Sequence, residues 1–136
     1  AAAGPNVRVV GRLSDRERDR WLASAQAFIF AAEEDFGIAP LEAQAAGMPV
    51  IALARAAANE TIRGLDDPAP TGVLYAEQTA AAIAHAVRAY EAHWHRIAPA
   101  ACIENAHRFE PERFRRELSA FVDARWDDFV THRAAT

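Results

Sequence analysis

The stretch Ala31–Leu53, AAEEDFGIAPLEAQAAGMPVIAL, decides how the rest of the chain is interpreted. Acidic residues precede a Phe-Gly pair, and Pro40 then opens an alanine-rich segment that is typical of a helix. A glycine ends this segment, and the β-branched run Val50–Leu53 predicts a strand. The stretch is therefore a loop, a helix that begins near residues 38–40, and a strand.

The turn around Gly37 is a candidate ligand site. Glycine takes backbone conformations closed to other residues, and the first N–H groups of a helix have no partner within it. Together with the positive end of the helix dipole, these groups favour a phosphate or a sugar hydroxyl. Glu34 and Glu42 frame the turn. One face of the helix is apolar and is predicted to pack on a sheet: Ile38, Leu41 and Ala45.

The same pattern also has a purely structural interpretation. Acidic residues are favourable at any helix N-terminus, and loop-helix-strand units with Gly and Pro occur in many α/β proteins that bind nothing there. Open α/β sheets do bind ligands at the carboxyl ends of their strands. The residues alone therefore leave both a ligand site and a structural turn open.

Other segments predict further elements of an α/β domain. Strands are predicted at Val7–Val10, Ala27–Ala31, Val50–Leu53 and Gly72–Tyr75. Helices are predicted from Ser14 to about Ala23, from Thr79 onward, over residues 98–108 and from Pro111. Alternating strands and helices favour a Rossmann-like three-layer domain with a parallel sheet of about four strands.

Three expectations about burial accompany these elements. Phe28, Ile29 and Phe30 in a row predict a strand that is buried on both faces. Trp21 and Leu22 are expected to pack inward from their helix. The last helix carries an apolar stripe that is predicted to be its buried side: Phe114, Leu118, Phe121, Val122, Trp126 and Phe129.

Composition excludes several classes of protein. The chain has 136 residues, 51% of them hydrophobic, and a net charge of -4, which fits one globular domain. There is no basic run, so nucleic acid is not expected as a partner. No apolar stretch reaches membrane-spanning length and no signal peptide is visible. Cys102 is the only cysteine, which favours a reducing, cytoplasmic location.

No metal site is predicted. Asp66 and Asp67 lie in a turn, where adjacent carboxylates normally face solvent, and His93 and His95 would point about 200° apart on a helix. Arginines near the N-terminus are interpreted as surface residues in preference to phosphate ligands: Arg8, Arg12 and Arg16.

The segment EDFGIAPLEAQAAGMPVIA resembles the signature of the family 4 retaining glycosyltransferases, nucleotide-sugar enzymes with two Rossmann-like domains in the GT-B fold. In that signature a Glu, seven residues and a second Glu follow one another, as Glu34 and Glu42 do. Four more segments fit the family in order: NVRVVGRLSD, NETI, TGVLY and NAHRFEPERFRRELSAFV. The sequence is most similar to bacterial mannosyltransferase-type members.

The resemblance implies that residues 1–136 are the later part of the C-terminal nucleotide-sugar-binding domain. The start of this domain, with the family's basic pair for the diphosphate, and the N-terminal acceptor domain would lie outside the chain. The last helix leans on the other domain in the family, so without it Trp126 and Phe129 would be exposed and would favour crystal or dimer contacts. We expect the chain alone to be inactive and to bind donor weakly.

The resemblance also implies roles for individual residues. Glu34 is the candidate catalytic residue and would bond hydroxyls of the donor sugar, although a nucleophilic role is not implied. Glu42 would accept hydrogen bonds from the ribose hydroxyls. Backbone amides would meet sugar or diphosphate oxygens: those of Phe36, Gly37, Ile38 and Ala39. Phe36 is alternatively a packing residue that orients the loop.

The implied reaction is transfer of a hexose, with mannose favoured, from a nucleotide diphosphate sugar to a hydroxyl acceptor with retention. No metal or cofactor is expected. The acceptor would be a glycan or a lipid-linked molecule bound through the missing domain, which leaves peripheral attachment at the inner membrane face open.

One departure from the family leaves other functions open. The family usually has two glycines shortly before the position of Glu60, where this chain has Ala56 and Ala57. Two Cβ atoms there would narrow the site or force a different loop path. A non-catalytic nucleotide-sugar-binding module and a protein-interaction module without a ligand are therefore alternatives.

Overall fold

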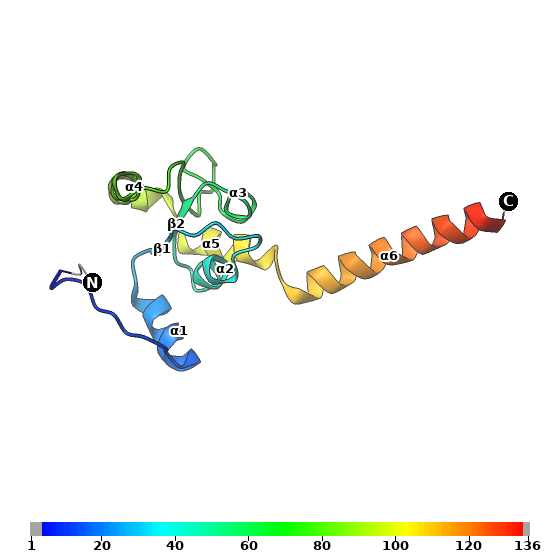
Figure 1. Cartoon of the computed structure of the whole chain (residues 1–136), viewed down its shortest axis with the longest axis horizontal. Helices are drawn as coiled ribbons and strands as arrows, with labels where there is room; N and C mark the ends of the chain where they lie inside the picture. Colours follow the sequence, from blue (N-terminus) through cyan, green and yellow to red (C-terminus); the bar gives the residue numbers. More distant parts are fainter. Residues whose placement is uncertain (1–3, 135–136) are drawn as a thin grey trace.

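A sheet of three parallel strands lies at the centre of the molecule, as seen in the computed structural model, which describes residues 4–134 (Figure 1). The strands are β1 (Phe28–Phe30), β2 (Val50–Leu53) and β3 (Gly72–Tyr75), and they pair in that order. The predicted α/β class and parallel sheet are confirmed. Among the described residues the sheet has three strands rather than about four.

The helices follow the local signals in the sequence. They are α1 (Asp15–Ser24), α2 (Ile38–Ala45), α3 (Ala58–Thr61), α4 (Ala80–His93), the 3₁₀ turn η1 (Trp94–Arg96), α5 (Pro99–His107) and α6 (Pro111–Ala134). Ser14 and Glu17 form the predicted capping box of α1, and Thr79 caps α4 by accepting a 3.1 Å hydrogen bond from the Ala82 amide. Prolines open α5 and α6, where the missing N–H leaves no bond unmade.

The buried strand β2 divides the core into two layers. Its alternate residues face opposite sides of the sheet, as the period of a strand requires. Val50 belongs to an apolar cluster with Ala43 of α2, whereas Ile51 belongs to a cluster with Ala86 of α4. Helices therefore cover both faces, and the predicted three-layer arrangement is confirmed.

Two predictions about strands are wrong. Residues 7–10 form no strand, and Val9 is 83% exposed. A strand needs the backbone of a neighbour for its hydrogen bonds, and the amide of Val7 donates instead to Gly4 O in a turn. In β1, Phe28 and Phe30 pack on the core, but Ile29 on the opposite face is 50% exposed, because α4 covers that face mainly over β2 and β3.

Two helix faces differ from the predictions. Trp21 is 47% exposed, and only Leu22 packs on the core from α1. In α2, Ile38 is 66% exposed and Ala45 is also exposed, so the predicted apolar face is rotated from the real one. The buried residues of α2 are Pro40, Leu41, Ala43 and Gln44, because this helix packs on α5 as well as on the sheet.

Helix α6 extends away from the rest of the chain, with its C-terminal end far from the sheet (Figure 1). The prediction that its apolar stripe is buried is wrong, since Phe114, Phe121 and Trp126 are each 63% exposed. Phe129 is 53% exposed. Ion pairs such as Arg113–Glu117, with 2.6 Å between Nε and Oε1, support the isolated helix.

Candidate functional site

The carboxyl ends of the three parallel strands meet at one edge of the sheet, and hydrogen bonds tie together the loops that follow them. The loop after β1 contains the acidic residues of the candidate site. It is held by Gln78 Nε2, which donates to Ala31 O at 2.7 Å, by Arg55 Nη1, which lies 3.4 Å from Glu33 Oε2, and by the Ala57 amide, which lies 3.4 Å from Glu34 O. The loops after β2 and β3 therefore fix the loop after β1.

Gly37 makes the turn between that loop and α2. Its backbone is left-handed, with φ 75° and ψ 69°, a conformation that strains any residue with a Cβ. Helix α2 begins at the next residue, and no side chain caps its N-terminus. The N–H groups at the start of α2 therefore remain available to a ligand.

Glu34 lies on the rim of this turn with an exposed side chain. Among residues 4–134, no group forms a hydrogen bond or an ion pair with its carboxylate. The space beneath the loop is a hollow of about 10 Å³ bordered by Phe36, Ala57 and Thr61, which is room for about one water molecule. A ligand larger than water therefore has room only on the outer, solvent side of the loop.

Glu42 faces helix α1. Its side chain is 41% exposed, and Oε1 lies 3.7 Å from Nη1 of Arg18. The hydrogen bond that Arg18 donates to the Asp19 carboxylate, and then the negative charge of Glu42, raise the pKa of Arg18. No sequence motif distinguishes Arg18 from the other arginines of its segment, and its contact with Glu42 is visible only in the folded chain.

Phe36 packs against the joint between α5 and α6. Its ring is 48% exposed and meets the ring of Phe109 edge-on, with 6.0 Å between centroids. Both rings border a largely apolar cavity of about 630 Å³, which also touches Pro111 and Phe114. This contact supports the interpretation of Phe36 as a residue that orients the loop. The side chains of Ile38 and Ala39 face solvent, so only their amides could bind a ligand.

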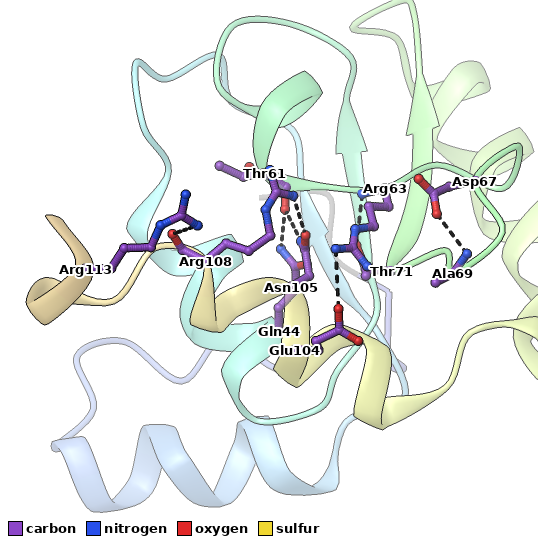
Figure 2. Close-up of polar contacts among 10 residues, drawn as sticks. All are labelled: Gln44, Thr61, Arg63, Asp67, Ala69, Thr71, Glu104, Asn105, Arg108 and Arg113. Atoms are coloured by element: carbon purple, nitrogen blue, oxygen red, sulfur yellow. Dashed lines mark hydrogen bonds and ion pairs between the residues drawn. The ribbon is translucent and has the colours of Figure 1, made fainter. Parts of the chain in front are cut away.

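A buried amide network supports the site from below (Figure 2). Gln44 and Asn105 are completely buried, and both donate to the carbonyl oxygen of Thr61, at 2.9 and 2.8 Å. The Thr61 hydroxyl in turn donates to Ala57 O at 2.8 Å. Because the Ala57 amide holds the Glu34 loop, the network connects that loop to α2 and α5. This network was not predicted from the sequence, since amide side chains on helices usually face solvent.

Ala56 and Ala57, at the positions where the resemblance predicts glycines, differ in conformation. Ala56 has a φ of 44°, in the left-handed region where glycine is free of strain, whereas Ala57 is helical with a φ of -62°. The loop therefore keeps a path that suits glycine at the first position. We estimate that the Cβ of Ala56 costs about 1 kcal/mol.

Among residues 4–134, no cluster of three or more His, Cys, Asp and Glu side chains could hold a metal ion. Likewise, none of the helices in this range has both the length and the apolar character needed to cross a membrane.

Comparison with known proteins identifies the family. Residues 1–109 match the family model described as Glycosyl transferases group 1. The chain belongs to this family. A solved structure of sucrose-phosphate synthase from Thermosynechococcus elongatus matches 88% of the chain with a TM-score of 0.71 and 25% identity.

The group 1 match confirms the prediction that the chain belongs to a glycosyltransferase. The chain spans 30% of the sucrose-phosphate synthase structure, so it corresponds to part of that protein. No curated protein sequence matches the chain. The group 1 match ends at residue 109, which leaves the whole of α6 outside it.

Proposed function

We propose that residues 1–136 are the later part of the donor-binding domain of a retaining GT-B glycosyltransferase. The whole protein would transfer a hexose, with mannose favoured, from a nucleotide diphosphate sugar to a hydroxyl acceptor. One observation carries the proposal: the left-handed turn at Gly37 presents an uncapped helix start between Glu34 and Glu42. Membership of the group 1 family and the position of the turn at the carboxyl edge of a parallel sheet support it.

Each part of the turn has a chemical task in this proposal. The amides of Phe36, Gly37, Ile38 and Ala39 donate to sugar or diphosphate oxygens, which a helix N-terminus favours. Glu42 accepts hydrogen bonds from the ribose hydroxyls. Glu34 accepts bonds from hydroxyls of the donor sugar and places its negative charge near the reacting carbon.

The reaction exchanges one bond for another on the same face of the sugar. The bond between the anomeric carbon and the diphosphate oxygen breaks, and a bond from that carbon to the acceptor oxygen forms. The acceptor hydroxyl gives its proton to the departing diphosphate oxygen, and the nucleoside diphosphate leaves with the electron pair of the broken bond. Positioning and stabilisation of charge on the leaving group supply the rate, so the proposal includes no metal or cofactor.

In this proposal the acceptor binds to the N-terminal domain, which lies outside this chain. The acceptor would be a glycan or a lipid-linked molecule. The enzyme would be cytoplasmic, with peripheral contact to the inner membrane face left open. The 136-residue chain alone would then be inactive and bind donor weakly. Micromolar binding of a nucleotide sugar to this chain by calorimetry would contradict that part.

The proposed activity is tested by a screen of GDP-, UDP- and ADP-sugars for hydrolysis and transfer by the whole protein. We expect turnover of one donor class, lost in Glu34→Gln and reduced in Glu42→Gln. Binding without turnover would support the alternative of a non-catalytic nucleotide-sugar module, which the strained Ala56 favours. Absence of both would support a protein-interaction module.

A further inference from the structure

Arg18 connects helix α1 to the carboxylate proposed to bind ribose. Its Nη1 atom lies 3.7 Å from Glu42 Oε1, across the seam between α1 and α2. We infer that Arg18 is a positioning residue that holds the Glu42 carboxylate ready for the ribose hydroxyls of the donor. This inference rests on the proposed function.

Two carboxylates of α1 also contact the Arg18 guanidinium group. Its Nη1 atom lies 3.3 Å from Asp15 Oδ1, and its Nη2 atom lies 3.2 Å from Asp19 Oδ1. The guanidinium group is planar, so these two contacts, both with exposed carboxylates, favour one orientation of its plane. Its Nε atom is buried and has no hydrogen-bond partner among residues 4–134, which is unfavourable. The contacts of Nη1 and Nη2 with the three carboxylates compensate for this cost.

The ion pair leaves Glu42 able to bind a ligand. Arg18 contacts Oε1 only, and the Glu42 side chain remains 41% exposed. The other oxygen of the carboxylate is therefore free to accept a hydrogen bond from a hydroxyl. A charged acceptor forms the stronger kind of hydrogen bond, so the geometry suits a sugar diol.

The ion pair between Arg18 and Glu42 should affect donor binding more than it affects the stability of the fold. Both side chains are more than 40% exposed, and ion pairs at such positions add little to the free energy of unfolding. A glutamate on a helix surface otherwise samples several rotamers, and this freedom is lost when it binds a ligand. A partner that restricts Glu42 beforehand removes part of that loss, which strengthens binding.

A measurement without ligand tests the positioning directly. Carbon-proton and proton-proton couplings report the χ1 rotamers of Glu42 in the 136-residue chain. We expect one dominant rotamer in the wild type and in Arg20→Ala, a matched variant on the same helix, and rotamer averaging in Arg18→Ala. Averaging in the wild type, or a single rotamer in Arg18→Ala, would overturn the inference.

A binding measurement tests the consequence. GDP-mannose, UDP-glucose and ADP-glucose are titrated into the wild type, Arg18→Ala, Arg18→Lys and Arg20→Ala, followed by NMR. We expect Arg18→Ala to raise the Kd of the bound donor about threefold to fivefold without changing the melting temperature, and Arg18→Lys to restore part of the affinity. Arg20→Ala should bind like the wild type.

A double variant separates positioning from direct contact. If Arg18 acts through Glu42, Arg18→Ala changes the Kd by less than about 1.5-fold in a Glu42→Gln background. If the two effects multiply, Arg18 contacts the donor itself and the inference is wrong. Failure of all three donors to bind the wild type would contradict the proposed function, whereas donor binding that ignores Arg18→Ala would contradict the inference alone.

Discussion

The side-chain amide of Asn105 donates a 2.7 Å hydrogen bond to the side-chain oxygen of Gln44, although the two residues are 61 positions apart. Both side chains are completely buried. Asn105→Ala would leave the Gln44 oxygen without this partner and open a small cavity. We expect the free energy of unfolding to fall by about 2–4 kcal/mol, measured by urea denaturation.

The neighbouring residue provides the control for this prediction. Glu104 is on the same helix, but its side chain is 73% exposed and only reaches Arg63 at 3.7 Å. Glu104→Ala should therefore lower the free energy of unfolding by about 0.5 kcal/mol or less. Equal losses in the two variants would show that the amide network does not stabilise the fold.

Ala56→Gly should stabilise the chain, against the usual effect of glycine. Ala56 has a positive φ of 44°, so removing its Cβ relieves strain, whereas Ala57 is helical. We expect Ala56→Gly to raise the free energy of unfolding by about 0.5–1 kcal/mol and Ala57→Gly to lower it by a similar amount. Thermal unfolding measures both, and destabilisation by Ala56→Gly would contradict the geometry of this loop.

Gly37→Ala should weaken donor binding through the backbone. A Cβ at Gly37 would meet Pro40 at 3.5 Å, an ordinary contact, so the damage comes from the φ of 75°. Gly11 has a similar φ of 66°, and a Cβ there would meet nothing within 4 Å. Each alanine variant should destabilise the chain by about 1 kcal/mol, and only Gly37→Ala should reduce the shifts caused by nucleotide sugars in NMR spectra. Equal donor binding by both variants would contradict a role for the Gly37 turn.

The single cysteine should make stability fall at alkaline pH. Burial raises the pKa of the Cys102 thiol from 9.0 to about 11. The folded chain therefore keeps a proton that the unfolded chain loses above pH 9.0, so stability present below that pH is lost as the pH rises through about 11. Urea midpoints should fall less steeply over this range in Cys102→Ala than in the wild type. Parallel curves would show that the buried thiol does not contribute.

Helix ends and the three strands of the sheet could be predicted from sequence because their signals are local. Ser14 with Glu17, and Pro111, act within one turn of the helix that they begin. Residues 7–10 were wrongly predicted as a strand because pairing needs a neighbouring backbone, which a local pattern does not reveal. The buried face of α2 was rotated from the predicted one because α5, far along the chain, packs against it.

The candidate site, like the fold, could be predicted from sequence only where its signals are local. The spacing of Glu34 and Glu42 and the special backbone at Gly37 are visible in the sequence, and the structure has the expected turn. Arg18 and Asn105 were missed because each acquires its role from a residue on another helix. Surface arginines and helical amides are too common for sequence alone to indicate these two.

The central claim is that the rim between Glu34 and Glu42 binds a nucleotide sugar. Its most direct test is titration of the ¹⁵N-labelled chain with GDP-mannose, UDP-glucose and ADP-glucose at millimolar concentration. We predict that one donor shifts the amides of residues 33–41 selectively, and that Glu34→Gln and Glu42→Gln each weaken this binding about tenfold or more, while Glu91→Gln on α4 does not. Unchanged amides in this loop with all three donors would contradict the claim.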